Sequence, residues 1–161
     1  MRKVSLGKTW FNSQPETPPP ETKFEIDYSR RIYIFDVVPV GAVRMTQSDK
    51  WKTNPNHPEP KKRQRLEVTK YFKFKDSVRE QAQKMNYKLG DTLEIIFCVP
   101  MPQSWSEKKK ERMNKLPVKT RPDADNYVKA FMDSLAKEDG NVWFIKAEKR
   151  HSFQGSIIVY Q

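Results

Sequence analysis

The sequence is short of the residues on which several classes of protein depend. Its one cysteine cannot form an internal disulfide, and with only two histidines beside it a tetrahedral structural zinc site cannot be completed. The longest apolar run, Ile95 to Val99, is far too short to span a bilayer. The first residues are basic but lack the apolar stretch of a secretion signal. We therefore expect a cytoplasmic protein with no membrane partner.

What the sequence has in excess is positive charge. It contains 31 lysines and arginines against 20 aspartates and glutamates, which gives a formal net charge of +11. Such an excess attracts polyanions, so charge alone favours nucleic acid or an anionic membrane surface as the partner. Of the two, nucleic acid is the partner that we expect. Hydrophobic residues make up 36% of the 161 residues, too many for a fully disordered chain. The length suits one domain with a compact core.

The chain divides into an N-terminal extension, 1–29, and one domain, 30–161. The extension contains the Pro-rich spacer ETPPPE, whereas the regular patterns of strands and helices follow it. The patterns predict strands at 30–38, 92–99, 142–149 and 155–160, and helices at 69–87, 105–115 and 124–136.

The expected class is α/β in the α+β sense, a mixed sheet of about four strands with about three helices, because the strict alternation of a doubly wound fold is missing. Ser104 is the expected N-cap of the second helix, with Glu107 completing a capping box. A long loop carries the basic run Lys61 to Arg65 between the first strand and the first helix. Loops of this length inside compact domains are usually functional or mobile.

The densest group of polar side chains lies at the start of the third predicted helix. Asp123 and Asp125 are two residues apart, and Lys129 and Asp133 follow Asp125 at helical spacing. The ordinary interpretation is an N-cap followed by a solvated ladder of ion pairs, and spacing alone favours it. The functional interpretation is that two carboxylates converge on one Mg²⁺, whose other ligands are water and substrate phosphates.

The basic surroundings give the functional interpretation its weight. Positive residues cluster at 61–75 and again at 108–121, directly before the acidic segment. An enzyme that cleaves DNA needs cations to hold the phosphates and clustered carboxylates to hold a metal.

The segment RPDADNYVKAFMDSL, followed by EDGNVW, resembles the signature of the RusA-type Holliday-junction resolvases, which is D-x-D-N-x-x-K-x-x-x-D-x-L with an acidic pair after a short loop. The resemblance covers roughly 30–150 and includes PVGAVRMTQSDKW, after the first strand. It implies an endodeoxyribonuclease that depends on Mg²⁺, with Mn²⁺ as an alternative ion. It also implies a homodimer that resolves four-way DNA junctions by paired symmetric nicks in recombination and repair.

The resemblance assigns roles residue by residue. Asp123, Asp125 and Asp139 take the metal-binding positions, with Glu138-Asp139 standing for the acidic pair. Lys129 takes the motif lysine, which would contact the scissile phosphate or balance the carboxylates. Together with the charge pattern, the resemblance predicts the following DNA-binding residues: Arg44, Lys61, Lys62, Arg63, Arg65, Lys119, Arg121 and Lys146.

Three alternatives stay open. A nuclease core of the form P-D…(D/E)-x-K could begin at Pro122-Asp123, but it needs an acid two residues before a lysine. Phe144 holds that place before Lys146 and Ala147 holds it before Lys149, so the paired acid is absent. A basic DNA- or RNA-binding protein would use the same lysines without cutting. A family member could also keep junction binding and lose turnover.

Overall fold

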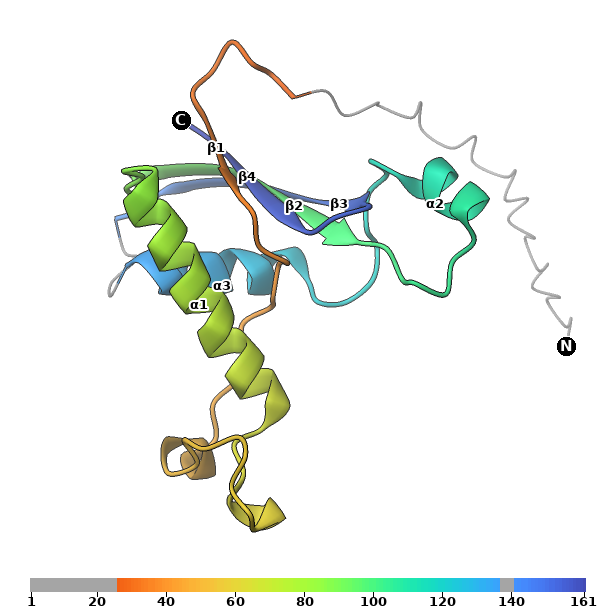
Figure 1. Ribbon diagram of the computed structural model, residues 1–161. Coiled ribbons are helices and arrows are strands. Elements are labelled where there is room, and N and C mark those ends of the chain that lie inside the picture. Colours follow the sequence, from red (N-terminus) through yellow and green to blue (C-terminus); the bar gives the residue numbers. More distant parts are fainter. Residues whose placement is uncertain (1–25, 137–140) are drawn as a thin grey trace, which may run out of the picture.

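The computed structural model describes residues 26–136 and 141–161. These residues form one mixed sheet with two helices packed on one of its faces (Figure 1). The predicted class, four strands with three helices, is confirmed. In chain order the elements are β1 (Ile32–Phe35), the short 3₁₀ helices η1 (Gln47–Lys50) and η2 (Pro60–Lys62), α1 (Leu66–Lys84), β2 (Thr92–Pro100), α2 (Glu107–Met113), α3 (Ala124–Leu135), β3 (Phe144–Ser152) and β4 (Ser156–Tyr160).

The strands lie in the order β1-β4-β2-β3. β4 is antiparallel to both of its neighbours, whereas β2 and β3 are parallel along their whole length, from Thr92 opposite Phe144 to Pro100 opposite Ser152. A parallel pair needs a long crossover, and the crossover here contains α2 and α3. α3 therefore runs back along the sheet, and its first and last turns lie at opposite ends of β3.

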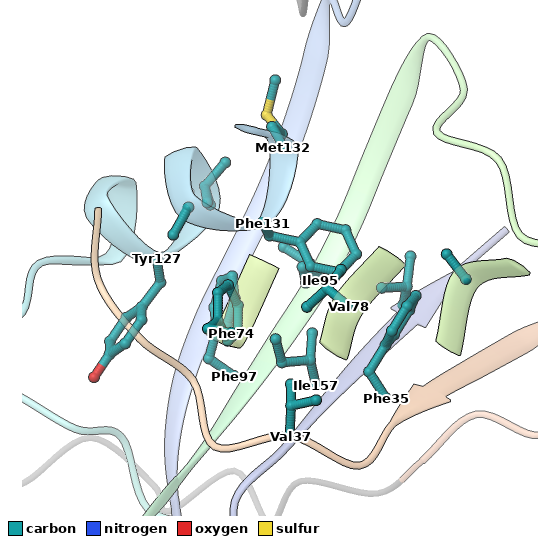
Figure 2. Close-up of a cluster of buried hydrophobic side chains, with 14 of the residues drawn as sticks. Phe35, Val37, Phe74, Val78, Ile95, Phe97, Tyr127, Phe131, Met132 and Ile157 are labelled. Atoms are coloured by element: carbon teal, nitrogen blue, oxygen red, sulfur yellow. The ribbon is translucent and has the colours of Figure 1, made fainter. Parts of the chain in front are cut away.

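The core lies between the sheet and the helices α1 and α3. Because side chains alternate along a strand, every second residue of β2 and β4 points toward the helices. Phe131 of α3 lies in one cluster with Val78 of α1 and Ile95 of β2 (Figure 2). The rings of Phe35 and Phe131 meet edge to face at 5.2 Å, and both side chains are fully buried. Nearer the start of α3, the ring of Tyr127 stacks on that of Phe97 at 5.3 Å, so the packed core also fixes the beginning of this helix.

Polar contacts join α1 to α3 at the rim of that core. The Tyr71 hydroxyl donates to Oδ2 of Asp133 at 2.9 Å, and Nε of Arg79 donates to the Ser134 carbonyl at 2.8 Å. Burial, and then the bond to Asp133, raise the pKa of Tyr71 well above its usual range. Asp133 therefore belongs to the packing of the two helices.

Two predicted helix boundaries are wrong. α1 covers Leu66–Lys84 rather than 69–87, because Val68 and Tyr71 begin its buried stripe and Asn86, at φ 51°, reverses the chain before Gly90. α2 begins at Glu107 with Ser106, not Ser104, as its N-cap. The Ser106 hydroxyl accepts from the Lys109 N–H at 3.4 Å.

Strand boundaries also differ from those predicted. β1 is limited to four residues, and β3 ends at Ser152 rather than 149 because the parallel register with β2 extends it. Of the predicted extension, residues 1–25 lie outside the described residues. Ile26 packs on the outer face of the sheet against Ile96 and Ile158. Among the described helices, none has the length and apolar character that crossing a membrane requires.

Candidate active site

Asp123 and Asp125 stand at the exposed first turn of α3. Asp123 is the N-cap by its extended backbone, at φ −69° and ψ 159°, but its side chain makes no capping hydrogen bond. Asp125 lies in the first helical turn, and both residues are exposed. Asp123 is therefore an N-cap by its backbone conformation, but its carboxylate does not cap the helix. That carboxylate remains available to a ligand.

Lys149 of β3 holds the backbone that leads into Asp123. Its Nζ donates to the carbonyls of Thr120 and Pro122, each at 2.7 Å. The same loop is tied to the edge of β3 by the Val118 N–H, which donates to the Lys149 carbonyl at 2.9 Å. The peptide bond between Arg121 and Pro122 is cis. Lys149 is thus a positioning residue for Asp123 that the sequence analysis missed.

The segment after β1 braces the same turn from another side. A Cβ at Gly41 would lie 2.9 Å from Cβ of Pro122, so only glycine allows this close approach without a shift. The Ala42 N–H donates to the Asn126 carbonyl at 2.9 Å. Two segments distant in sequence, β3 and the segment after β1, therefore converge on the Pro122 to Asn126 turn, a degree of bracing that a surface N-cap does not require.

Lys129 lies one turn beyond Asp125, on the same face of α3. Its side chain is 64% exposed, and its Nζ is 3.9 Å from Oδ1 of Asp133. Exposed ion pairs of this kind contribute at most about 1 kcal/mol. Because Asp133 is also bonded to Tyr71, Lys129 lies between a structural carboxylate and the exposed Asp125. The ammonium is accessible to a phosphate there.

Glu138 and Asp139, the predicted acidic pair, lie outside the described residues. The residues on either side, Ala136 and Asn141, line a cavity of about 280 Å³ beside Gly90, at the far end of α3 from Asp123. A helix of 12 residues is about 18 Å long. No group of three metal-ligating side chains occurs within 26–136 and 141–161. The described part of the site therefore supplies two carboxylates.

Two carboxylates fit a magnesium ion. Mg²⁺ is usually held by one or two carboxylates and keeps several waters, with substrate phosphates completing its octahedral shell. Asp123 and Asp125 offer oxygen ligands only, on an exposed turn that a DNA strand can reach. Mn²⁺ accepts the same oxygen donors.

The predicted DNA-binding residues of the long loop differ in their surroundings. Arg65 is held by Asp49, whose Oδ1 and Oδ2 accept from Nε at 3.0 Å and Nη2 at 2.6 Å. Arg63 donates to the carbonyl of His57 at 2.6 Å, and Lys62 pairs with Glu59 at 2.9 Å. Lys61 and Arg44 are exposed, and within the described residues neither side chain has a recorded ion pair.

Asp49 explains the position of Arg65. Its side chain is only 2% exposed, and the Arg65 guanidinium, followed by hydrogen bonds from Thr46, holds its pKa well below the usual range. Nη2 of Arg65 also donates to the Arg44 carbonyl at 3.0 Å. The sequence analysis missed Asp49, whose signal was its place as one of only two acids in the basic segment 44–65.

The remaining predicted cations lie on two sides of the molecule. Lys119 and Arg121 are exposed on the segment that leads into Asp123. Lys146 projects instead from the outer face of the sheet, where it pairs with Glu94 at 2.7 Å, and Arg30 pairs with the same carboxylate at 2.6 Å. The structure brings Lys119 and Arg121 to the carboxylates, and Lys146 lies away from them.

Comparison with known proteins identifies a family. The family model described as endodeoxyribonuclease RusA matches residues 37–159, which include both carboxylates, Lys149, the strands β2 and β3 and all of β4 except its last residue. No curated protein and no solved structure matches the chain. The resemblance found in the sequence is confirmed: the chain belongs to the RusA family of endodeoxyribonucleases.

Proposed function

We propose that this protein is a Mg²⁺-dependent endonuclease that resolves four-way DNA junctions by paired symmetric nicks. It would act in the cytoplasm, in DNA recombination and repair. The observation that carries the proposal is the braced, exposed pair Asp123 and Asp125 at the start of α3, in a chain of net charge +11 that belongs to the RusA family. Membership supports nuclease chemistry, and the site supports metal-assisted hydrolysis.

Each residue at the site has a distinct part in this function. Asp123 and Asp125 would hold the ion, which when bound supplies a Lewis acid and a more acidic water. Lys119 and Arg121 would bind the phosphates on either side of the scissile bond. The first turn of α3 adds its unpaired N–H groups and its positive dipole end, both of which favour a phosphate. Lys129 would neutralise charge that develops on the phosphate. Asp139 is proposed as a third ligand on the acidic pair of the signature alone, since the neighbouring Ala136 and Asn141 lie at the end of α3 opposite Asp123.

Paired nicks require two sites, so we propose a homodimer. A four-way junction presents two strands related by a two-fold axis, and a two-fold dimer would place one site against each. Sedimentation equilibrium without DNA should show a species of twice 19.1 kDa at micromolar concentration. A single 19.1 kDa species would contradict the dimer and not the chemistry.

A labelled mobile four-way junction tests the activity. Wild-type protein should nick it with Mg²⁺ or Mn²⁺ and not with EDTA, and should leave linear duplex intact. Asp123→Asn is the inactive variant, and Asp76→Asn is its matched control, because Asp76 is an exposed acid on α1 that pairs with Arg79. The second candidate function, junction binding without cleavage, is favoured because no third metal-ligating side chain joins Asp123 and Asp125 within the described residues. Tight binding with no nicks under any metal would establish it.

A further inference from the structure

The segment 44–65, called the arm below, lies apart from the sheet beyond the first turn of α1 (Figure 1). It is braced around Asp49, whose carboxylate accepts from the Thr46 N–H at 2.7 Å, from the Thr46 hydroxyl at 2.8 Å and from two nitrogens of Arg65. The side chain of Asp49 is 2% exposed. A polar centre therefore fixes the conformation of the arm.

Trp51 directly follows η1 on this braced arm, and it is 85% exposed. Beside it lies an open hollow of about 380 Å³, lined also by Lys52, His57 and Lys62. Tryptophan has the largest apolar area of any side chain, and leaving it in water loses the stabilisation that burying this area would give. Scattered exposed apolar residues are ordinary in proteins, but this one lines a hollow whose other walls carry cations.

The charges of the arm favour a phosphate backbone as the neighbour of Trp51. Its two acids, Asp49 and Glu59, are paired with Arg65 and Lys62. Within the described residues, five other cations of the arm have no ion pair, although one of them, Arg63, donates to the carbonyl of His57. The five are Arg44, Lys50, Lys52, Lys61 and Arg63. A second copy of this chain would bring another +11 charge against the same surface, so charge complementarity disfavours it.

The arm begins beside the candidate carboxylates. Gly41 lies against Pro122, and the Ala42 N–H donates to the Asn126 carbonyl, only a few residues before η1. A DNA strand that crosses the turn at Asp123 can therefore continue onto the arm. Single strands are recognised where bases stack on aromatic side chains and phosphates lie along a positive groove.

We propose that Trp51 is a stacking platform for an unstacked base at the branch point, with Lys52 on a neighbouring phosphate. This inference rests on the proposed function in one respect, that the substrate is branched DNA. Stacking tolerates any sequence because every base has a π-face. Trp51 would thus select for DNA whose bases are already unpaired, as they are where strands exchange.

Binding by Trp51→Ala and Trp51→Phe in the full chain tests the inference. The matched control is Trp143→Ala, because Trp143 is also highly exposed, at 74%, but lies directly before β3 rather than on the arm. Affinity is measured for a four-way junction and for a single-stranded oligonucleotide, with 2-aminopurine at the branch point as the reporter of stacking. Trp51→Ala should weaken binding by roughly five- to a hundredfold and abolish the 2-aminopurine quenching. Trp51→Phe should retain most of both, and Trp143→Ala should equal wild type.

Three results would overturn the inference. These are wild-type affinity in Trp51→Ala, equal losses in Trp51→Ala and Trp143→Ala, and a change of oligomeric state in Trp51→Ala on sedimentation, which would make Trp51 a protein contact. Thermal unfolding of each variant verifies that the fold is intact. Cleavage is measured separately. Wild-type protein that binds and quenches but never cuts would contradict the proposed function and still confirm the role of Trp51.

Discussion

Asp49 on the one hand, and Asp123 and Asp125 on the other, differ in burial and in hydrogen bonding. Asp49 is almost completely covered and accepts hydrogen bonds from both Thr46 and Arg65. Asp123 and Asp125 are exposed, and no hydrogen bond to either carboxylate is recorded within the described residues. A carboxylate whose lone pairs are all used can only stabilise structure. A carboxylate that is held in place by its backbone and left open can bind a ligand, and so the two groups should respond differently to every perturbation.

The largest difference should appear in cleavage. Asp123→Asn and Asp125→Asn should each reduce junction nicking at least about 10³-fold, because each removes a ligand of the metal. Junction affinity should be unchanged or higher, since repulsion of the phosphates falls. The free energy of unfolding of both variants should lie within about 0.5 kcal/mol of that of wild type, as is usual for substitutions at exposed positions. A parallel loss of binding and cleavage in a folded variant would count against the assignment.

Metal-linked stabilisation should be the next largest effect. The free energy of unfolding of the wild-type protein should rise by about 2.7 kcal/mol when Ca²⁺ or Mg²⁺ is present at a hundredfold excess over its Kd. If Asp139 is the third ligand, Asp139→Asn should reduce this gain and Glu138→Gln should reduce it less. Thermal unfolding with and without the ion measures both variants. An equal gain in wild type and Asp139→Asn would remove Asp139 from the site and leave Asp123 and Asp125 as its acids.

Lys149 tests whether bracing makes the difference between the two groups. Lys149→Met should weaken Ca²⁺ binding, because the carbonyls of Thr120 and Pro122 lose the donor that fixes the turn before Asp123. We expect a loss of about tenfold by calorimetry, the usual lower limit for removing a residue that orients metal ligands. Lys149→Arg should restore part of the affinity. The matched control is Lys146→Met, on the same strand but paired with Glu94, and its metal affinity should equal that of wild type.

Sequence reasoning reached the fold and the two exposed carboxylates because both depend on local pattern. The strand β2 and the helix α3 were predicted nearly to the residue, since apolar periodicity and the Asp123 N-cap are local signals. Lys149 could not be found in this way. Its partners, Thr120 and Pro122, are brought to it by the antiparallel bridge between Pro117 and Arg150, which joins segments far apart in the sequence. The P-D…(D/E)-x-K pattern named Lys149 only to dismiss it for lacking an acid.

The role of Arg65 shows the converse limit. Its place in a basic run predicted contact with DNA, and that prediction remains untested. The structure shows that its guanidinium already has a carboxylate partner 16 residues away, Asp49. Composition gives the charge of a loop, and only the folded chain gives the number of charges left for a ligand.

The pH dependence of stability should separate the two groups further. The pKa of Asp49 lies well below the 3.8 of a free side chain, so the ionised form is favoured in the folded state. Its contribution is therefore complete above about pH 4 and is lost as pH falls through the folded pKa. Asp49→Asn should have a lower melting temperature than wild type at pH 7, and the difference between the two melting temperatures should be smaller at pH 3. A gap that is constant with pH would show that Asp49 acts through packing rather than charge.

The smallest effect distinguishes paired from unpaired cations of the arm. Lys61 is exposed, and no carboxylate partner is recorded for it among the described residues, whereas Lys62 is bonded to Glu59 at 2.9 Å. Each phosphate neutralised on B-DNA contributes about −0.9 to the slope of log K against log salt. Lys61→Gln should therefore flatten the slope of junction binding by up to about 0.9. Lys62→Gln should flatten it less, because Glu59 already neutralises that ammonium. Arg65→Gln should lower the melting temperature and leave the slope closer to that of wild type, since the Arg65 guanidinium is already hydrogen-bonded to Asp49.

A slope that falls equally in all three variants would show that DNA draws the paired cations away from their carboxylates. The comparison between satisfied and open charges would then hold only for the free protein.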